Sequence, residues 1–387
     1  MNSNVRRISL KLHLWIALLP GWVVFVVCIT GALYAFKDEI TALSEPWRFV
    51  KAEGKPVLYP SSVVEVATKE VSQAKPTAIT YGRATDAVFV DYYDPKTGMT
   101  TVFINPYDGQ IIKTVKKGKN DFDFFRFVLN GHRTLWLPAK IGRPIVGWSV
   151  LLFAIGLMTG IILWIPAQWK YLKNNFSIRR KRLTYTLHNT LGGLFVPFLL
   201  LATFTGLIWS FNWFSKAVYT MTGGGDLKPY VLPKSDPLTV AEQLSNPLDK
   251  LYIQLREADP QAPTFYFSLP ADSSGVFRVS IEHKRNSYYR TDNLFFDQYT
   301  LKPLHGQGPY AGKYTEVSTA DKIRRMNLEI HDGRILGIFG KCIAFCSSLV
   351  GASLSVTGFI LWRKRTFRNK ERRQINSSDS KRKTNNR

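Results

Sequence analysis

The chain has 387 residues, of which 52 are lysine or arginine and 28 are aspartate or glutamate, for a formal net charge of +24 at pH 7. Because 45% of the residues are hydrophobic, this charge does not belong to a disordered polycation, whose apolar content would be low. With only three cysteines, Cys28, Cys342 and Cys346, a disulfide scaffold and a cysteine-ligated zinc or iron–sulfur site are not expected.

Four stretches of the chain are long, apolar and almost free of charge. They cover residues 14–36, 145–165, 191–211 and 335–362, and the last is interrupted only by Lys341. Each has about 20 residues or more, the length that an α-helix needs to cross the hydrocarbon core of a bilayer. We expect four unbroken transmembrane helices that pack as a bundle.

The basic residues indicate the orientation of these helices. The first twelve residues carry three basic residues, residues 166–187 carry six, and the tail from Arg363 carries eleven with only two acidic residues. The long loops nearly balance, with 13 basic and 12 acidic residues in 37–131 and 14 and 13 in 212–331. The positive-inside rule therefore predicts that both termini and the middle loop are cytoplasmic. Since the excess charge reports topology, a nucleic-acid partner is not expected and membrane lipid is.

The expected domains follow from these boundaries. They are the N-terminus and first span (1–36), a first outer domain (37–131), the second span with its entry (132–165), a basic cytoplasmic loop (166–187), the third span (188–211), a second outer domain (212–330), the fourth span (331–362) and a basic tail (363–387).

Both outer loops have the residue patterns of small α+β domains. In the first, residues 61–72 have apolar residues at helical spacing, and runs at 87–93, 100–105 and 110–115 alternate between apolar and polar residues. In the second, a helix is expected to start at 239–244 and strands are expected at 264–269, 277–282 and 293–296. Such alternation between Pro, Asp and Gly turns favours antiparallel strands.

The chain contains an internal repeat of histidines and Thr-Gly pairs. His13 and His188 are followed by Thr-Gly pairs 17 and 18 residues later, which end at Gly31 and Gly206. The other two histidines are followed by their pairs 26 to 28 residues later; His132 leads to Gly160 and His331 to Gly358. Two halves, roughly 1–170 and 178–387, therefore each have the order helix, outer domain, helix.

The repeat predicts two histidine pairs, one at each side of the membrane. His13 and His188 open outward-going helices and lie near the cytoplasmic face, whereas His132 and His331 precede inward-going helices and lie near the outer face. Two neutral imidazoles from facing helices are what a b-type haem needs. We expect two haem b groups whose iron is bound by the inner and the outer pair.

Helix geometry brings the four glycines to the same two depths. At about 1.5 Å per residue, Gly31 and Gly206 come near the outer histidine pair, and Gly160 and Gly358 come near the inner pair. A glycine lets a flat macrocycle approach the backbone, although small residues also serve plain helix packing. Further candidates are basic residues that could hold the haem propionates or anchor the helices at the interface: Arg133, Arg143 and Lys341.

Several motifs occur together in this chain: Thr-Leu-His188, the four Thr-Gly helices, the stretch from Asp94 to Gly98 and the stretch from Phe103 to Gly109. In these motifs the sequence resembles the PepSY-associated transmembrane family. Known members include inner-membrane ferric-siderophore reductases and iron-uptake proteins of Gram-negative bacteria. The resemblance implies a bacterial inner-membrane location, haem b in the bundle, PepSY-like domains in the periplasm and one-electron reduction of a ferric chelate there. The second outer domain departs from the pattern, with Leu301 where the first has Gly109.

Two functions fit these features. The first is a haem-containing reductase that carries electrons from an inner haem to an outer haem and on to a periplasmic ferric siderophore. Because there is no dinucleotide fingerprint and the cytoplasmic segments are short, its electron donor would be another protein, a soluble reductant or a membrane quinol. The second is a non-enzymatic component that binds or transports an iron chelate or a peptide. The absence of an expected break within any span speaks against a transporter.

Overall fold

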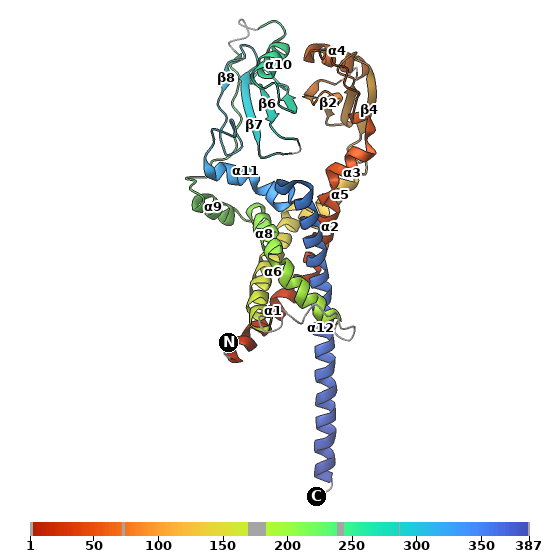
Figure 1. The fold of residues 1–387 in the computed structure, drawn as a ribbon, viewed down its shortest axis with the longest axis vertical. Coiled ribbons are helices and arrows are strands. Elements are labelled where there is room, and N and C mark those ends of the chain that lie inside the picture. The colour runs from red at the N-terminus through yellow and green to blue at the C-terminus, as the bar shows by residue number, and fades with distance from the viewer. Residues whose placement is uncertain (1–2, 72–73, 169–182, 238–243, 286, 386–387) are drawn as a thin grey trace. The chain divides into compact units, whose positions relative to one another are not determined.

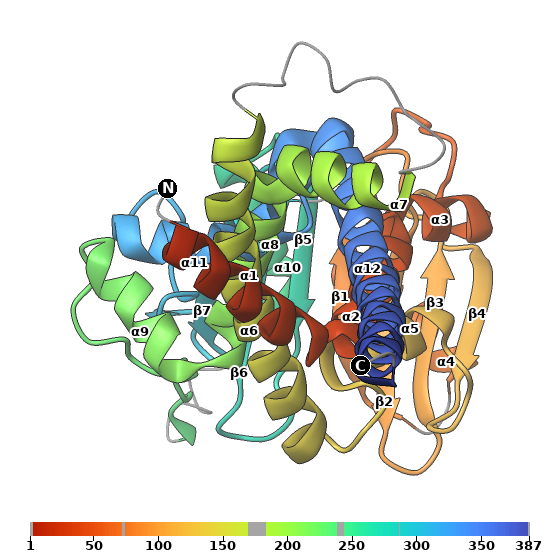
Figure 2. The same ribbon diagram turned by 90° about the horizontal axis from the view of Figure 1, so that it is seen from below.

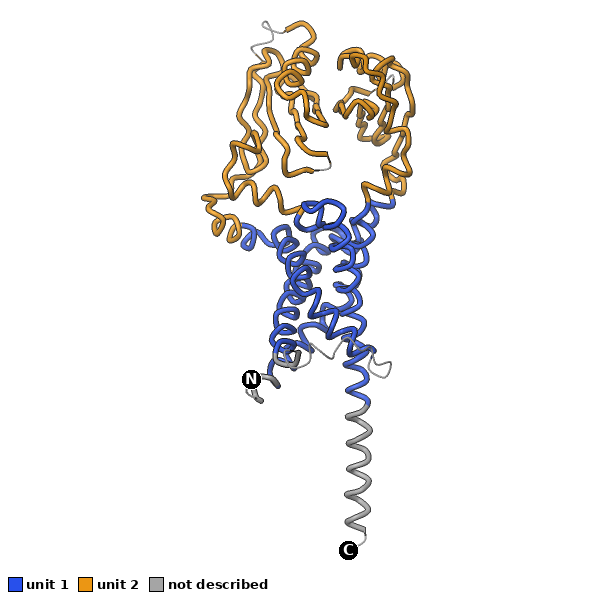
Figure 3. Tube along the Cα trace, viewed as in Figure 1, with its two compact units in different colours: residues 1–36, 124–215, 330–387 blue, residues 37–123, 216–329 orange. Residues whose placement is uncertain are grey.

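The computed structural model describes residues 3–71, 74–168, 183–237, 244–285 and 287–385, and it divides into two compact units (Figure 3). The helical unit consists of residues 1–36, 124–215 and 330–387, and the sheet unit consists of residues 37–123 and 216–329. Each unit therefore draws on both halves of the chain.

The helical unit is built from long apolar helices (Figure 1). Its elements are α1 (Ser3–Leu18), α2 (Gly21–Ala35), α5 (Phe124–Thr134), α6 (Ala139–Gln168), α7 (Leu183–Thr186), the π-helical turn η3 (Leu187–Leu191), α8 (Gly192–Ser210), the 3₁₀ turn η5 (Arg334–Leu336) and α12 (Gly337–Asn385), and α9 (Asn212–Met221) begins in it. Within the part of the chain that the structure describes, three segments are long and apolar enough to cross a membrane: Ala139–Ile165, Leu183–Ser210 and Arg334–Phe367.

The first expected span is bent, so the prediction of four unbroken spans is wrong at this point. Residues Arg7–Leu18 and Gly21–Ala35 meet at 61°, and they make a fourth span only if the bent pair crosses as one. Pro20 lies at the break, where its ring and its missing N–H prevent the helix from continuing. A hydropathy pattern counts apolar residues and does not register such a bend.

The helices of this unit pack in a ring of neighbours. Helix α6 contacts α8, α8 contacts α12, α12 contacts α2, and α2 contacts α6; helix α1 packs on α6 outside this ring. A small apolar cluster fills the interior between α6, α8 and α12 and contains Leu157, Leu199, Val350 and Leu354. Residues 169–182, most of the expected basic cytoplasmic loop, lie outside the described residues.

The sheet unit has the same order of elements in both loops, one helix followed by four strands. The first loop supplies α4 (Pro60–Glu70), β1 (Pro76–Tyr81), β2 (Val88–Asp94), β3 (Gly98–Ile104) and β4 (Ile111–Lys117), after α3 (Lys37–Ser44) and η1 (Pro46–Arg48). The second supplies α10 (Pro247–Ala258), β5 (Thr264–Ser268), β6 (Val276–Glu282), β7 (Thr291–Asp297) and β8 (Pro303–Leu304), followed by α11 (Thr319–His331). The helix expected at residues 239–244 falls almost entirely outside the described residues.

The two loops form one sheet, whereas the sequence led us to expect two separate domains. The strand order is β4-β3-β2-β1-β5-β6-β7-β8, and β1 pairs with β5 in an antiparallel register that sets Ile79 opposite Phe267. Strands β1 and β5 are labelled in Figure 2. The loops are also joined between helices, because Asp249 at the start of α10 accepts a hydrogen bond of 2.7 Å from the backbone N–H of Ser61 in α4. Each half-sheet would otherwise leave a strand edge unpaired.

The core of the sheet unit lies between one face of the sheet and helices α4 and α10. Its fully buried side chains alternate along the central strands, as in Ile79, Val90, Phe265 and Phe267, and Leu251 of α10 packs on them. Burying each such side chain contributes about 1.5–3 kcal/mol. The shared core therefore stabilises the two loops together.

The turn before β8 keeps its conformation without the glycine of the first loop. Gly109 has φ 76°, and Leu301, its counterpart, has φ 58°, in the region that most residues avoid. Asp297 supports this turn, because its carboxylate accepts hydrogen bonds of 3.0 Å and 2.9 Å from the N–H groups of Tyr299 and Thr300. The departure of the second loop from the family pattern is thus a change of residue and leaves the turn in place.

Candidate functional site

The helical unit brings the four repeated histidines together in two pairs. The imidazole rings of His13 (α1) and His188 (η3) have centroids 6.3 Å apart, and those of His132 (α5) and His331 (α11) have centroids 6.0 Å apart. These are the two pairs that the repeat predicts. We call them the first pair and the second pair.

The spacing of the rings fits two axial ligands of one metal ion. A ring centroid lies about 1.1 Å from its own nitrogen atoms, and a bond from an imidazole nitrogen to a first-row metal is about 2.0–2.1 Å. Two imidazoles on opposite sides of one ion therefore have centroids roughly 6.2–6.4 Å apart. Both pairs agree with this value to within a few tenths of an ångström, so the residues present fit a bis-histidine haem.

Each histidine is anchored through Nδ1 to a neighbouring helix. The Nδ1 atom of His13 lies 3.0 Å from the carbonyl oxygen of Gly156, and that of His132 lies 2.8 Å from the carbonyl oxygen of Val27. His331 lies 3.0 Å from the carbonyl oxygen of Ala202, and His188 bonds to the backbone of Leu354. Among the described residues no hydrogen bond engages Nε2 of any of the four, so this nitrogen is available as a ligand.

Threonine hydroxyls reinforce three of these anchors. The Nδ1 atoms of His13, His188 and His331 lie 3.1 Å, 2.9 Å and 2.9 Å from the Oγ1 atoms of Thr159, Thr357 and Thr205, respectively. The fourth threonine of the repeat, Thr30, donates instead to the carbonyl oxygens of Val26 and Val27, at 2.7 Å and 3.0 Å. The Thr-Gly repeat contains these threonines, but it did not lead us to predict contacts between their hydroxyl groups and the histidines.

The four glycines lie against the imidazole rings. A Cβ atom added to Gly31 would lie 3.1 Å from Cε1 of His132, and one added to Gly206 would lie 3.6 Å from Cε1 of His331. A Cβ atom on Gly160 would lie 3.4 Å from Cε1 of His13, and one on Gly358 would lie 3.4 Å from Cε1 of His188. Each pair thus meets the two glycines predicted for it. The space beside these glycines is occupied by the histidine side chains. The sequence had led us to expect the haem macrocycle in that space.

Two of the four histidines lie at unusual backbone conformations. His188 lies in the π-helical turn η3, a form that is rare and concentrated at functional sites. After His132 the chain turns sharply through Leu135 and Trp136, whose φ angles are 54° and 59°. The ring of Trp136 packs so closely on Gly131 that any Cβ there would overlap it. Hydropathy patterns carry no signal for either feature.

The three basic candidates differ in their surroundings. Arg133 and Arg143 have exposed side chains, whereas Lys341 is only 4% exposed within α12. The positive charge of Lys341 acts on Asp332, the residue after His331, which forms an ion pair of 2.7 Å with Arg334. A role of the three basic residues in holding propionates stays a prediction.

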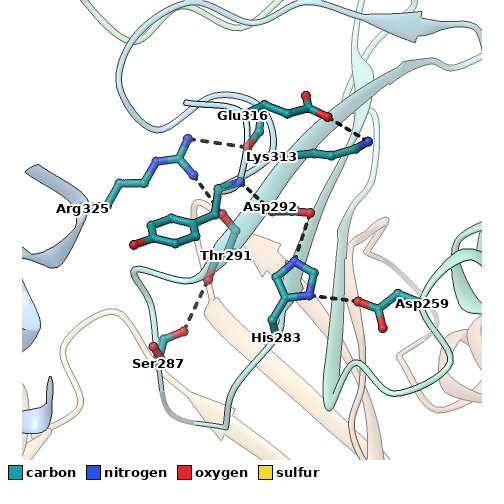
Figure 4. A network of polar contacts seen from close by, with 10 residues as sticks. Asp259, His283, Ser287, Thr291, Asp292, Lys313, Glu316 and Arg325 are labelled. Atoms are coloured by element: carbon teal, nitrogen blue, oxygen red, sulfur yellow. Dashed lines mark hydrogen bonds and ion pairs between the residues drawn. The ribbon is translucent and has the colours of Figure 1, made fainter. Parts of the chain in front are cut away.

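The two histidines outside the repeat lie in the sheet unit. His283 bridges two carboxylates, with Nδ1 2.9 Å from Oδ2 of Asp259 and Nε2 3.0 Å from Oδ2 of Asp292 (Figure 4). Both ring nitrogens are therefore already engaged. His305 is exposed. Neither residue resembles the four anchored histidines, whose Nε2 atoms are available.

The comparison with known families agrees with the resemblance noted in the sequence. The family described as the PepSY-associated TM region matches residues 10–365, which is nearly the whole chain. No curated protein matches the chain.

Proposed function

Because the chain belongs to the PepSY-associated transmembrane family, we propose that it is a haem-binding reductase of the bacterial inner membrane. It takes electrons from a donor on the cytoplasmic side or in the membrane and delivers them to a ferric siderophore in the periplasm. The observation that carries this proposal is the arrangement of the two histidine pairs, each with the ring spacing of a bis-histidine ligand set.

The residues of the two pairs are prepared to bind metal through Nε2. Each Nδ1 atom is held by an acceptor on a neighbouring helix, which directs Nε2 away from that helix. A haem b bound at each pair would supply a reversible one-electron couple of its iron, and the neutral imidazoles of the pair would hold it. The protein contributes the ligands, a low-dielectric surrounding and a fixed geometry.

The two pairs are separated along the bundle. His188 of the first pair and Ala202, which accepts from His331 of the second pair, are 14 residues apart on η3 and α8. At about 1.5 Å per residue, this places the two pairs roughly 21 Å apart along that helix. The cluster of Leu157, Leu199, Val350 and Leu354 lies in the same helices and keeps the interior apolar.

The distribution of charge supports the orientation. The short segments rich in lysine and arginine would face the cytoplasm, and the two loops that build the sheet unit would face the periplasm. One-electron reduction converts Fe(III) in a chelate to Fe(II), which hard oxygen donors hold far less tightly, so the iron is released. The electron donor would be another protein, a soluble reductant or a membrane quinol.

Reduction across a sealed membrane tests this function. The full-length protein is reconstituted in liposomes with reductant trapped inside, and a ferric hydroxamate chelate and an Fe(II) indicator are added outside. We expect Fe(II) to form outside with the wild-type protein, and not with His331→Ala or His188→Ala. His305→Ala is the matched control, because this histidine is exposed and outside both pairs, and it should act like the wild type. Equal rates in all variants and in empty liposomes would contradict the proposal.

The second candidate, a binding or transport component for an iron chelate or a peptide, gains one observation from the structure. The bend of 61° in the first expected span is the kind of break at which transporters bind substrates. This function predicts uptake of labelled ferric chelate into liposomes without electron transfer. The reductase predicts reduction outside without uptake.

A further inference from the structure

The four histidine anchors have one construction. In each, a backbone carbonyl at position i faces the imidazole, a threonine follows at i+3 and a glycine at i+4, and we call this unit a histidine socket. The four sockets are Val27-Thr30-Gly31, Gly156-Thr159-Gly160, Ala202-Thr205-Gly206 and Leu354-Thr357-Gly358.

In three of the four sockets the threonine oxygen also contacts the histidine, and there it can only accept. Its hydroxyl proton is already donated within its own helix, from Thr159 to Gly156 at 2.9 Å, from Thr205 to Ala202 at 2.9 Å, and from Thr357 to Ser353 at 2.7 Å. The oxygen then faces Nδ1 of the histidine with a lone pair, as does the carbonyl oxygen. Two acceptors facing one nitrogen require that this nitrogen carry the proton.

The sockets of the two pairs are unequal. In the first pair both histidines contact a threonine oxygen, at 3.1 Å for His13 and 2.9 Å for His188. In the second pair His331 contacts one at 2.9 Å, while His132 has the carbonyl oxygen of Val27 as its acceptor. A hydrogen-bond acceptor at Nδ1 makes Nε2 more basic, so Nε2 gives its electron pair more strongly to a bound metal ion. This favours the more highly charged state of that ion.

We propose that each histidine socket fixes its histidine as the Nδ1–H tautomer, and that the unequal threonine contacts give the two haem sites different reduction potentials. This inference rests on the proposed function, since it assigns positioning residues to the haem ligands of that function. Three threonines (Thr159, Thr205 and Thr357) lower the potential of the site they serve, and Thr30 does not.

Redox titration of the purified, haem-loaded protein tests the assignment. Thr→Val removes the hydroxyl and nearly keeps the shape. Only the difference in hydrogen-bond strength between the ferric and the ferrous state shifts the potential, so a bond worth about 1 kcal/mol changes the ferric-to-ferrous ratio by at most about fivefold. For one electron this is about 40 mV. We expect Thr159→Val and Thr357→Val to raise the midpoint of one component and Thr205→Val to raise that of the other. Thr357→Ser, which keeps the hydroxyl, should restore the wild-type midpoint.

Thr30→Val is the matched control, because among the described residues the hydroxyl of Thr30 bonds to the carbonyl oxygens of its own helix alone. A shift as large as that of Thr205→Val, or no shift in the other three variants, would overturn the inference. If the wild-type protein binds no haem, the proposed function fails. The protonated ring nitrogen of each histidine is then identified from the ¹⁵N signals of labelled histidines in the haem-free chain. Protonation at Nδ1 of the four histidines supports the sockets, and protonation at Nε2 overturns them.

Discussion

Gly31→Ala is expected to weaken haem binding at the second pair. The new methyl carbon would lie 3.1 Å from Cε1 and 3.3 Å from Nδ1 of His132, closer than the 3.5–4.0 Å or so at which carbon atoms pack well. The ring has to move by a few tenths of an ångström, and it cannot do so freely because Nδ1 is bonded to the carbonyl oxygen of Val27 at 2.8 Å.

The size of the effect follows from the cost of overpacking. Forcing an extra methyl group into a packed interior costs about 1–3 kcal/mol, which corresponds to roughly 5- to 150-fold weaker binding. Gly206→Ala is the matched control on the other histidine of the same pair, because its methyl carbon would lie 3.6 Å from Cε1 of His331, an ordinary contact. It should change the affinity by less than about threefold.

The assay is titration of haem into the purified protein, followed by absorbance, with the haem-to-protein ratio measured at saturation. We expect Gly31→Ala to lose most of the second haem at a haem concentration that saturates the wild type, and Gly206→Ala to keep it. Equal behaviour of the two variants would refute the reasoning that the glycines make room for the histidine rings.

Two further predictions concern the sheet unit. Burial by itself would raise the pKa of Asp297, but the N–H groups of Thr300 and Tyr299 and the hydroxyl of Thr300 hold this pKa below its usual value. The Asp297 carboxylate therefore stabilises the fold above about pH 4. This stabilisation is lost as the pH falls through the pKa of Asp297 in the folded state. Asp297→Asn should lower the free energy of unfolding by about 1–3 kcal/mol at pH 7 and by less at pH 3, measured by circular dichroism, and an equal loss at both would count against it. His283→Gln breaks the bridge between Asp259 and Asp292 and should cost about 1–3 kcal/mol in urea unfolding, more than Asp259→Asn alone; the reverse order would contradict the bridge.

The sequence predicts the features of this fold that depend on periodicity within a segment. Apolar length locates the long helices, and residue alternation locates the six strands from β2 to β7 to within a residue or two. It does not predict that β1 and β5, almost 190 residues apart, pair with one another. Pairing between distant strands depends on tertiary packing, and both loops have the composition of self-contained domains. The bend at Pro20 was missed because hydropathy averages over it.

The sequence predicts those parts of the candidate site that occur in both halves of the chain. Nearly equal offsets between histidines and Thr-Gly pairs were enough to place His13 with His188 and His132 with His331. The hydroxyl of Thr357 was not assigned to His188 because that contact joins two helices 169 positions apart, and spacing along one helix does not contain it. The π-helical turn at His188 likewise depends on packing.

The most direct test of the central claim is the reduced-minus-oxidised absorbance spectrum of the full-length protein, purified after expression with ample haem. We predict b-type bands with about two haems per chain, and about one in His13→Ala, which would keep the second pair intact. A protein that is folded and carries no b-type bands would contradict the haem assignment and, with it, the proposed reductase.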